Sequence, residues 1–322
     1  MIRRMKIGAG AILASLFLLF PPAGNAQLKT VKIAATSKDV LDNLPLFVGV
    51  HMGYFQEVGQ KLEISYFRGG GEVVRAVTSH SVDIGGTCAA SAVLIAAAKG
   101  EPLRIVSSSA APISGVVWIV PADSPIKSIK DLKGKKAGYS SPGSVTFTVL
   151  QTILRKEGLD KDVQPVRVGS PGDSWAAVKN KLVDTGWHVI PQVYSLIGKK
   201  EARILFDASD YITEYQTTVV AVMEDVAKRD PEMIRNFLKA RAKAVRFIGE
   251  NAERTAAIWA EEVKLPVETV RLGLKAIKPG YWESGTPKEA NIKGALQEVL
   301  ETGAIKEPPD LKKLIDPGFL PK

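Results

Sequence analysis

The sequence has few residues that could cross-link the chain or hold a metal ion. Cys88 is the only cysteine among the 322 residues, which excludes an intramolecular disulfide, so buried apolar side chains must stabilise the fold. The three histidines, His51, His80 and His188, lack the short spacings that zinc ligands show. We therefore expect no metal site and no bound cofactor.

Long apolar runs are also scarce. Residues 7–20 form an apolar stretch, but it is shorter than the roughly 20 residues that a membrane-spanning helix needs. It follows Arg3, Arg4 and Lys6 and is followed by the small residue Ala26, which is the pattern of a cleavable secretory signal. Residues 1–26 therefore predict a signal peptide and a periplasmic mature chain, with a permanent N-terminal anchor as the alternative. No cysteine follows the expected cleavage position, so a lipid anchor is not expected.

The charge is mildly basic and spread along the chain. The formal net charge is +9, and loss of the three cations of the signal leaves +6 on residues 27–322. No block of lysine and arginine interleaved with aromatic residues occurs, so nucleic acid is not an expected partner. The mature length is sufficient for two domains.

Short β-branched runs alternate with helical patterns along the mature chain. This alternation predicts βαβ units, a largely parallel sheet and helices on both faces. The strand-like runs are residues 31–35, 62–67, 82–84, 103–106, 116–120, 166–168, 203–206 and 217–222. The helical stretches are residues 46–54, 72–79, 89–98, 145–156, 175–181, 232–249, 252–263 and 267–277.

An internal similarity suggests that one α/β unit occurs twice. Residues 76–85 resemble residues 177–186 at a constant offset of 101, with Asp83 matching Asp184 and Gly85 matching Gly186. Chance similarity is the alternative. A true duplication predicts two similar lobes that enclose a site at the carboxyl ends of their strands. The matched aspartates are expected to be structural caps rather than a catalytic pair.

Two stretches are candidates for the connections between the lobes. Residues 107–114 are small and rich in serine and alanine, and residues 209–216 precede another strand-like run. Two crossings predict a two-stranded hinge and a discontinuous first lobe. We expect lobe I to comprise residues 27–113 and 214–322, with the C-terminal helices packed on it, and lobe II to comprise residues 114–213.

An ordered set of motifs resembles one known family. These are residues 52–55 (MGYF), 69–72 (GGGE), 81–85 (SVDIG), 99–103 (KGEPL), 123–128 (DSPIKS), 131–136 (DLKGKK) and 141–144 (SPGS). The chain resembles the periplasmic substrate-binding proteins of ABC transporters, in the branch that holds nitrate-, sulfonate- and taurine-binding and THI5-like proteins.

The resemblance implies a type II periplasmic-binding-protein fold, with two doubly wound α/β lobes and a cleft between them. It also implies delivery of a small ligand to an inner-membrane ABC permease and no chemistry on that ligand. We expect a monomer that captures its solute by lobe closure, and facing helix N-termini would suit a small, anionic organic solute. A ligand-binding partner of a membrane sensor and a THI5-like pyrimidine-synthesising enzyme are the alternatives. Residues 185–191 depart from the family pattern, which leaves the identity of the solute open.

Candidate binding residues lie where strands give way to helices, because helix N-termini present free N–H groups and partial positive charge. Trp187 is expected to stack on the ligand or to plug the lobe, and His188 to donate to an anion or to lie at the hinge or in solvent. For Cys88 the alternative is a small buried helix residue. The full set of expected ligand-binding residues is Ser37, Leu44, Gly70, Gly71, Thr87, Cys88, Ser140, Ser141, Gly143, Ser144, Trp187 and His188.

Overall fold

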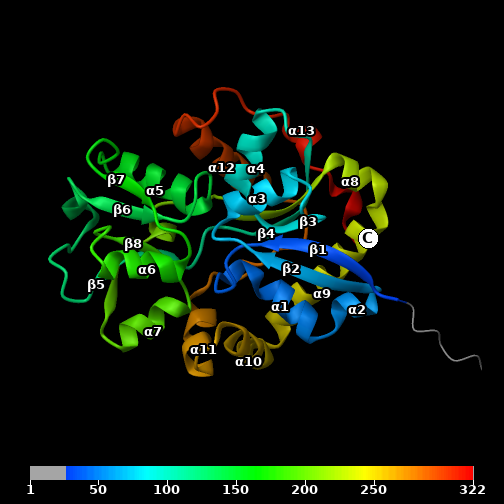
Figure 1. The fold of residues 1–322 in the computed structure, drawn as a ribbon, viewed down its shortest axis with the longest axis horizontal. Helices are drawn as coiled ribbons and strands as arrows, with labels where there is room; N and C mark the ends of the chain where they lie inside the picture. The colour runs from blue at the N-terminus through cyan, green and yellow to red at the C-terminus, as the bar shows by residue number, and fades with distance from the viewer. Residues whose placement is uncertain (1–26, 322) are drawn as a thin grey trace, which may run out of the picture.

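The computed structural model describes residues 27–321, so the predicted signal peptide lies outside the described residues. Figure 1 shows two lobes side by side, each with a sheet covered by helices. The five-stranded sheet of lobe I has the order β2-β1-β3-β10-β4. Its strands are β1 (Lys29–Ala35), β2 (Gln60–Tyr66), β3 (Ile84–Ala89), β4 (Leu103–Ala110) and β10 (Thr218–Met223).

Lobe II repeats this arrangement. Its strands are β5 (Val116–Pro121), β6 (Lys136–Tyr139), β7 (Gln164–Arg167), β8 (Gly186–Val189) and β9 (Ala202–Asp207). They form a β8-β5-β9 sheet and a β6-β7 pair, which a single parallel bridge between Ala137 and Thr185 joins. The resulting order, β7-β6-β8-β5-β9, matches that of lobe I position by position.

The helices pack on both faces of these sheets, as the alternation of patterns predicts (Figure 1). Lobe I has α1 (Leu44–His51), α2 (Tyr54–Glu57), α3 (Gly70–Thr78), α4 (Ala90–Ala98), α8 (Glu224–Arg229) and α9 (Pro231–Glu250). Lobe II has α5 (Val145–Lys156), α6 (Pro171–Lys179) and α7 (Gln192–Gly198). The C-terminal part has α10 (Ala252–Val263), α11 (Val267–Ala276), α12 (Glu289–Glu301) and α13 (Leu311–Leu314). Short 3-10 turns lie at Leu41–Asn43, Ile129–Leu132, Ala208–Asp210 and Pro317–Phe319.

The offset of 101 residues has a structural counterpart. The Asp83 carboxylate accepts a hydrogen bond from the backbone N–H of Lys32 in β1, and the Asp184 carboxylate accepts one from Lys136 in β6, both at 2.8 Å. A Cβ added at Gly85 would lie 2.7 Å from Val77 Cγ2, and one added at Gly186 would lie 2.8 Å from Val178 Cγ2. Each glycine therefore lets a strand approach a helix closely, and each aspartate ties two neighbouring strands together.

Three details of the predicted fold are wrong. The sheets are mixed rather than largely parallel, because β10 and β5 each insert antiparallel between two other strands. Residues Thr87 and Cys88 lie in β3, and Trp187 and His188 lie in β8, rather than in loops. Both stretches stay extended because each is a buried strand paired with a neighbour.

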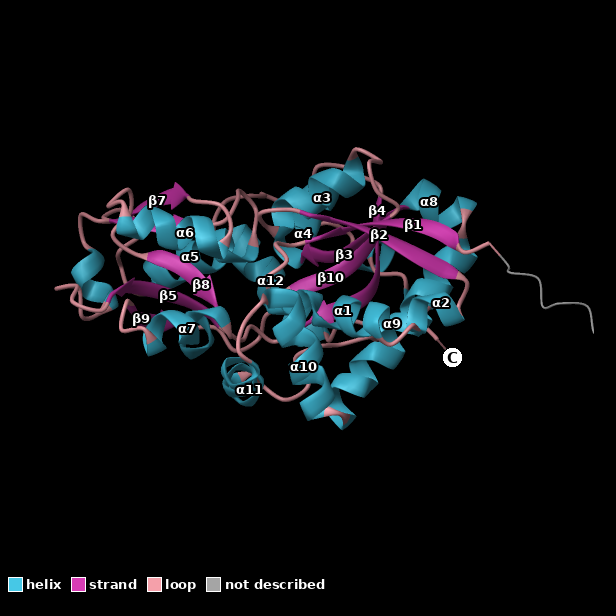
Figure 2. Cartoon of the chain, turned by 60° about the horizontal axis from the view of Figure 1, so that its bottom comes forward, coloured by secondary structure: helices cyan, strands magenta, loops and turns pink. Residues whose placement is uncertain are grey.

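The C-terminal helices do not pack on lobe I alone, which is the third difference. Helix α11 contacts α7 of lobe II, and α12 contacts both α4 and α5. Figure 2 shows α11 below the region where the lobes meet. Residues 281–285 also run beside the first connection, where Ala111 N–H donates to Tyr281 O at 2.9 Å. The lobe boundaries at 113/114 and 213/214 stay a prediction, compatible with the strands that each sheet contains.

Candidate ligand-binding site

The two lobes enclose a small cavity of about 40 Å³. Such a volume accommodates roughly three water-sized groups. Its walls combine apolar side chains with hydroxyls, glycines and two charged groups. Lobe I contributes Thr36, Val40, Leu41, Asp42, Arg68, Gly69, Gly70, Thr217 and Thr218, and lobe II contributes Val116, Ser140, Ser144, Val145, Thr146, Trp187 and Val189.

Two helices begin at the cavity, one from each lobe. Helix α3 begins at Gly70, after the extended residue Gly69. Helix α5 begins at Val145, and the Ser144 side chain caps it by accepting a hydrogen bond from Phe147 N–H at 3.2 Å. Free N–H groups and the helix dipole make both N-termini favourable positions for a negative charge.

Direct contacts across the lobes show that the cleft is closed. Ser91 Oγ of lobe I donates to Gly143 O of lobe II at 3.0 Å. A Cβ added at Gly69 would lie 2.7 Å from Ser140 Oγ, and one added at Gly71 would lie 2.4 Å from Pro142 O. Gly69 and Gly71 therefore allow the backbone of lobe I to approach lobe II more closely than a residue with a side chain would.

The turn after β1 is positioned by buried polar groups. Asn43 is fully buried and donates to Thr36 O at 3.1 Å and to Ser37 O at 2.9 Å. Thr87 accepts a hydrogen bond from Thr36 N–H at 2.8 Å. This network fixes the 3-10 turn Leu41–Asn43 and sets Asp42 on the cavity wall.

Asp42 is the buried acidic group of the cavity. Its side chain accepts a hydrogen bond from the Tyr281 hydroxyl, and the residue is only 5% exposed. Burial raises the pKa of Asp42 to about 6, although the hydroxyls of Tyr281 and Thr218 and the positive charge of Arg241 oppose the rise. Thr217 and Thr218 lie on the same wall, and within the described part of the chain neither buried hydroxyl makes a hydrogen bond of 3.5 Å or less.

Residues 41–255, about two thirds of the chain, match the family described as NMT1/THI5 like. The chain belongs to this family. A putative aliphatic sulfonates-binding protein of Escherichia coli (strain K12) is 26% identical over 206 residues, which cover 63% of each chain. The 4-amino-5-hydroxymethyl-2-methylpyrimidine phosphate synthase THI11 of Saccharomyces cerevisiae is 25% identical over 218 residues, 64% of this chain and 63% of that protein. The matches thus span just under two thirds of these relatives' own length.

Solved structures of similar proteins confirm the fold that is predicted for this NMT1/THI5-like chain. The periplasmic aliphatic sulphonate binding protein SsuA of Escherichia coli has a TM-score of 0.70 at 21% identity, covering 89% of this chain and 97% of that chain. A Candida albicans protein described as having the generic periplasmic binding protein fold has a TM-score of 0.75 at 17% identity, covering 90% and 96%. The protein has the two-lobed α/β architecture of periplasmic binding proteins.

Four of the expected binding residues line the cavity of this family member. These are Gly70, Ser140, Ser144 and Trp187. Trp187 is 3% exposed, and its ring N–H donates to Gly169 O at 3.1 Å, so the ring forms a fixed wall of the cavity. Ser140 hydrogen-bonds with Thr146 at 2.8 Å, which orients its hydroxyl at the start of α5.

The other expected residues lie beside the cavity rather than on its wall. Gly71 and Gly143 line a larger open groove of about 490 Å³ between α3, α4 and α5. Ser141 is buried next to Gly69. Ser37 hydrogen-bonds with Asp39, Leu44 is fully buried at the start of α1, and Thr87 supports Thr36. Any contact of these residues with ligand stays a prediction.

Cys88 and His188 lie in surroundings that suppress their reactivity. Cys88 is fully buried in β3, and burial raises the pKa of its thiol to about 12. His188 is 4% exposed, burial lowers its pKa, and its Nδ1 lies 3.3 Å from Val189 O. Neither side chain is on the cavity wall. Cys88 is a small buried residue, but it lies in a strand rather than in the helix of the structural alternative, and His188 is buried rather than in solvent. Contact of either side chain with ligand stays a prediction.

Six polar residues of the wall are absent from the set expected from sequence: Thr36, Asp42, Arg68, Thr146, Thr217 and Thr218. A signal for Asp42 was present, because this acidic residue lies between the apolar pairs Val40-Leu41 and Leu44-Pro45, with only Asn43 as a polar neighbour. Nothing in the composition of residues 217–222 marks the two threonines, since β-branched residues are typical of strands.

Two further features are absent from residues 27–321. No group of three or more His, Cys, Asp or Glu side chains in this range is arranged to hold a metal ion. No helix in the same range is long and apolar enough to cross a bilayer.

Proposed function

We propose that this protein is an extracytoplasmic solute-binding protein. It captures a small organic solute that carries an anionic group, closes its lobes around it and delivers it to an ABC permease. It acts as a monomer in the periplasm after residues 1–26 are removed, and it performs no chemistry on the solute.

The observation that carries this proposal is the cavity between the lobes, which is lined from both sides and faced by the N-termini of α3 and α5. A solute held there contacts both lobes, so its binding favours the closed arrangement. Each helix terminus contributes roughly 0.3–1 kcal/mol toward an anion. A micromolar dissociation constant corresponds to about 8 kcal/mol, so most of the affinity must come from other contacts and from burial during closure.

Binding without chemistry is favoured by the environment of the groups with catalytic potential. The thiol of Cys88 has a pKa far above neutrality, and the imidazole of His188 is buried away from the cavity wall. A nucleophile needs a lowered pKa or an adjacent base, and a general base must reach the substrate. The cavity wall carries hydroxyls, glycines, Asp42 and Arg68, a set suited to recognition.

The test is a binding screen on residues 27–322. Nitrate, short alkyl- and arylsulfonates, carboxylates and pyrimidines are compared by thermal shift, and positives are measured by calorimetry. A ligand at 100 times its dissociation constant adds about 2.7 kcal/mol of stability, which for a chain of this size is a rise of roughly 5 °C. We expect one-to-one binding of an acid and recovery of the solute unchanged. Stabilisation by neutral compounds alone, or turnover of the bound compound, would overturn the proposal.

A further inference from the structure

One ion pair joins the two lobes beside the ligand cavity. Glu72 lies in the first turn of α3 in lobe I, and Arg167 is the last residue of β7 in lobe II. The guanidinium of Arg167 donates to the Glu72 carboxylate. The side chain of Glu72 is only 16% exposed, whereas that of Arg167 is 48% exposed. The pair therefore lies at the edge of the closed cleft, with its carboxylate largely shielded from solvent.

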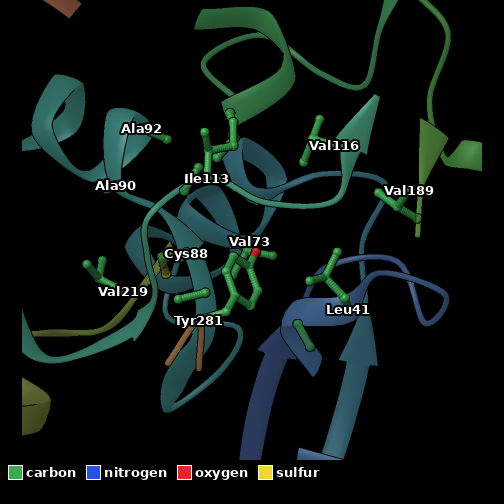
Figure 3. Close-up of a cluster of buried hydrophobic side chains, with 14 of the residues drawn as sticks. Leu41, Val73, Cys88, Ala90, Ala92, Ile113, Val116, Val189, Val219 and Tyr281 are labelled. Carbon is green, nitrogen blue, oxygen red and sulfur yellow. The ribbon is translucent and has the colours of Figure 1, made fainter. Parts of the chain in front are cut away.

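Glu72 is held in position by its own lobe. One of its carboxylate oxygens accepts a hydrogen bond from Arg68 N–H at 3.2 Å, which leaves the other oxygen to face lobe II. Figure 3 shows the next residue, Val73, among the buried hydrophobic side chains. Packing thus fixes α3, and the local hydrogen bond fixes the carboxylate on it.

Arg167 is held by the chain that forms the cavity wall of lobe II. It pairs with Tyr139 in the parallel β6-β7 ladder. Two residues later, Gly169 N–H donates to Ser140 O at 3.2 Å, and Gly169 O accepts a hydrogen bond from the ring N–H of Trp187 at 3.1 Å. Because Ser140 and Trp187 line the cavity, the segment that carries Arg167 must move with this wall.

The equivalent position of lobe II shows what is particular to Glu72. The offset of 101 residues places Asp173 there, at the start of α6, where its carboxylate accepts a hydrogen bond from Ser170 N–H at 3.1 Å as part of a capping box. An aspartate is long enough for that local bond. The glutamate in lobe I has one more methylene group, and it makes both the local bond and the contact with Arg167.

Opening of the lobes would break the Glu72–Arg167 pair and leave other ion pairs in place. Arg75 lies 3.6 Å from the same carboxylate, but both residues belong to α3, so their contact does not depend on closure. The pairs between α5 and α12 also join two parts of the chain. Helix α12, however, is bonded to the second connection, where Gln216 N–H donates to Asn291 O at 2.8 Å. Within residues 27–321, Glu72–Arg167 is the ion pair that we expect to depend on closure.

We propose that Glu72 and Arg167 form an electrostatic latch that holds the lobes closed, with Arg167 as a positioning residue that does not contact the solute. Neither side chain lines the cavity. Partly exposed ion pairs stabilise modestly, so the latch should raise the ratio of closed to open molecules by roughly 1.5- to 5-fold. Such a contribution favours closure and still permits reopening. The latch is independent of the identity of the solute, so it goes beyond the proposed function.

The experiment measures the separation of the lobes by pulsed dipolar spectroscopy. Spin labels are placed at Lys61→Cys in lobe I and Lys161→Cys in lobe II, which are both exposed positions. The native Cys88 is fully buried and does not compete for the label. Residues 27–322 are measured with and without ethanesulfonate as the probe. Salt is varied from about 10 mM to about 1 M, over which the screening length falls from about 30 Å to about 3 Å.

Arg167→Gln should lower the closed fraction at low salt, and high salt should remove most of the difference from the unaltered protein. Glu72→Asp keeps an acceptor for Arg68 N–H but is one methylene shorter, so it should behave like Arg167→Gln. Arg167→Lys keeps the charge and should retain part of the closure. Arg75→Gln is the matched control, because it removes a cation that faces the same carboxylate from within lobe I, and it should leave the separation unchanged.

Equal separations in the unaltered protein and Arg167→Gln under every condition would overturn the latch. An equal shift in Arg75→Gln would also overturn it, because the effect would then belong to the charge at the start of α3. A shift by Glu72→Asp that persists in the Arg167→Gln background would reduce Glu72 to a helix cap. Each of these outcomes leaves solute capture intact, whereas failure of every compound in the binding screen would overturn solute capture and leave the latch.

Discussion

The substitution Gly71→Ala should weaken ligand binding by opposing closure of the lobes, without lowering the stability of the ligand-free protein. Gly71 is the second residue of α3, and its backbone is not in the left-handed region, so alanine can adopt the same conformation. Replacing glycine by alanine within a helix stabilises it by up to about 1 kcal/mol. In the closed arrangement, however, the new Cβ would lie 2.4 Å from Pro142 O of the other lobe.

The size of the effect follows from what the new methyl group would meet. Real Cβ atoms keep at least 3.0 Å from such neighbours, so the lobes must separate by roughly 0.6 Å at this contact. The obstacle is a backbone carbonyl, which cannot rotate away as a side chain would. Overpacking of this kind costs about 1–3 kcal/mol. Because the cost falls only on the closed state, ligand affinity should drop by roughly 5- to 150-fold.

The assay pairs thermal unfolding without ligand with calorimetry using the strongest ligand of the screen. We expect Gly71→Ala to melt at or above the temperature of the unaltered protein and to bind less tightly. Gly249→Ala is the matched control, because Gly249 lies in α9 and a Cβ there would meet nothing within 4 Å. Unchanged affinity of Gly71→Ala would show that this contact is not made in the bound state. A lower melting temperature without ligand would show that the contact between Gly71 and Pro142 already forms in the ligand-free protein.

Two further predictions concern the polar wall of the cavity. Thr217→Val and Thr218→Val remove hydroxyls that have no partner in the described chain, so each should leave stability without ligand unchanged or higher and weaken ligand binding several-fold. The same change at Thr255, whose buried hydroxyl in α10 also has no described partner, is the control and should not alter affinity. Burial raises the pKa of Asp42 from 3.8 to about 6, so the folded state binds the extra proton and stability falls as the pH rises from 4 to 6. In urea unfolding, the stability of Asp42→Asn relative to the unaltered protein should therefore rise by about 2 kcal/mol between pH 4 and pH 7, and a constant difference would contradict this.

The sequence predicted the parts of the molecule that depend on local patterns. Helices 145–156 and 252–263 have the expected bounds, because apolar periodicity marks both helices and Ser144 caps the first of them. Strand β8 was missed because residues 185–188 read as a polar-aromatic loop, and only pairing with β5 makes them a strand. The glycines and serines at the starts of α3 and α5 could be found from sequence, since their role depends on short motifs.

Asp42 could not be assigned from sequence because its environment is built by distant residues. Its hydrogen-bond donor, Tyr281, lies 239 positions later in the chain. The charge that acts on it comes from Arg241 in α9. A pattern of neighbouring residues shows that an acid lies in an apolar stretch, but it does not show which side chains meet it in the folded state.

Tyr281 links the ligand cavity to the hinge. Its hydroxyl donates to Asp42 on the cavity wall, while its carbonyl accepts a hydrogen bond from Ala111 N–H in the first connection between the lobes, at 2.9 Å. The next residue, Trp282, forms a bridge with Ala110 and donates to Leu41 O at 2.8 Å, beside Asp42. A ligand in contact with Asp42 would therefore act on a segment that is itself bonded to the hinge. Through this segment, we expect even a solute that fits a cavity of about 40 Å³ to influence the arrangement of both lobes.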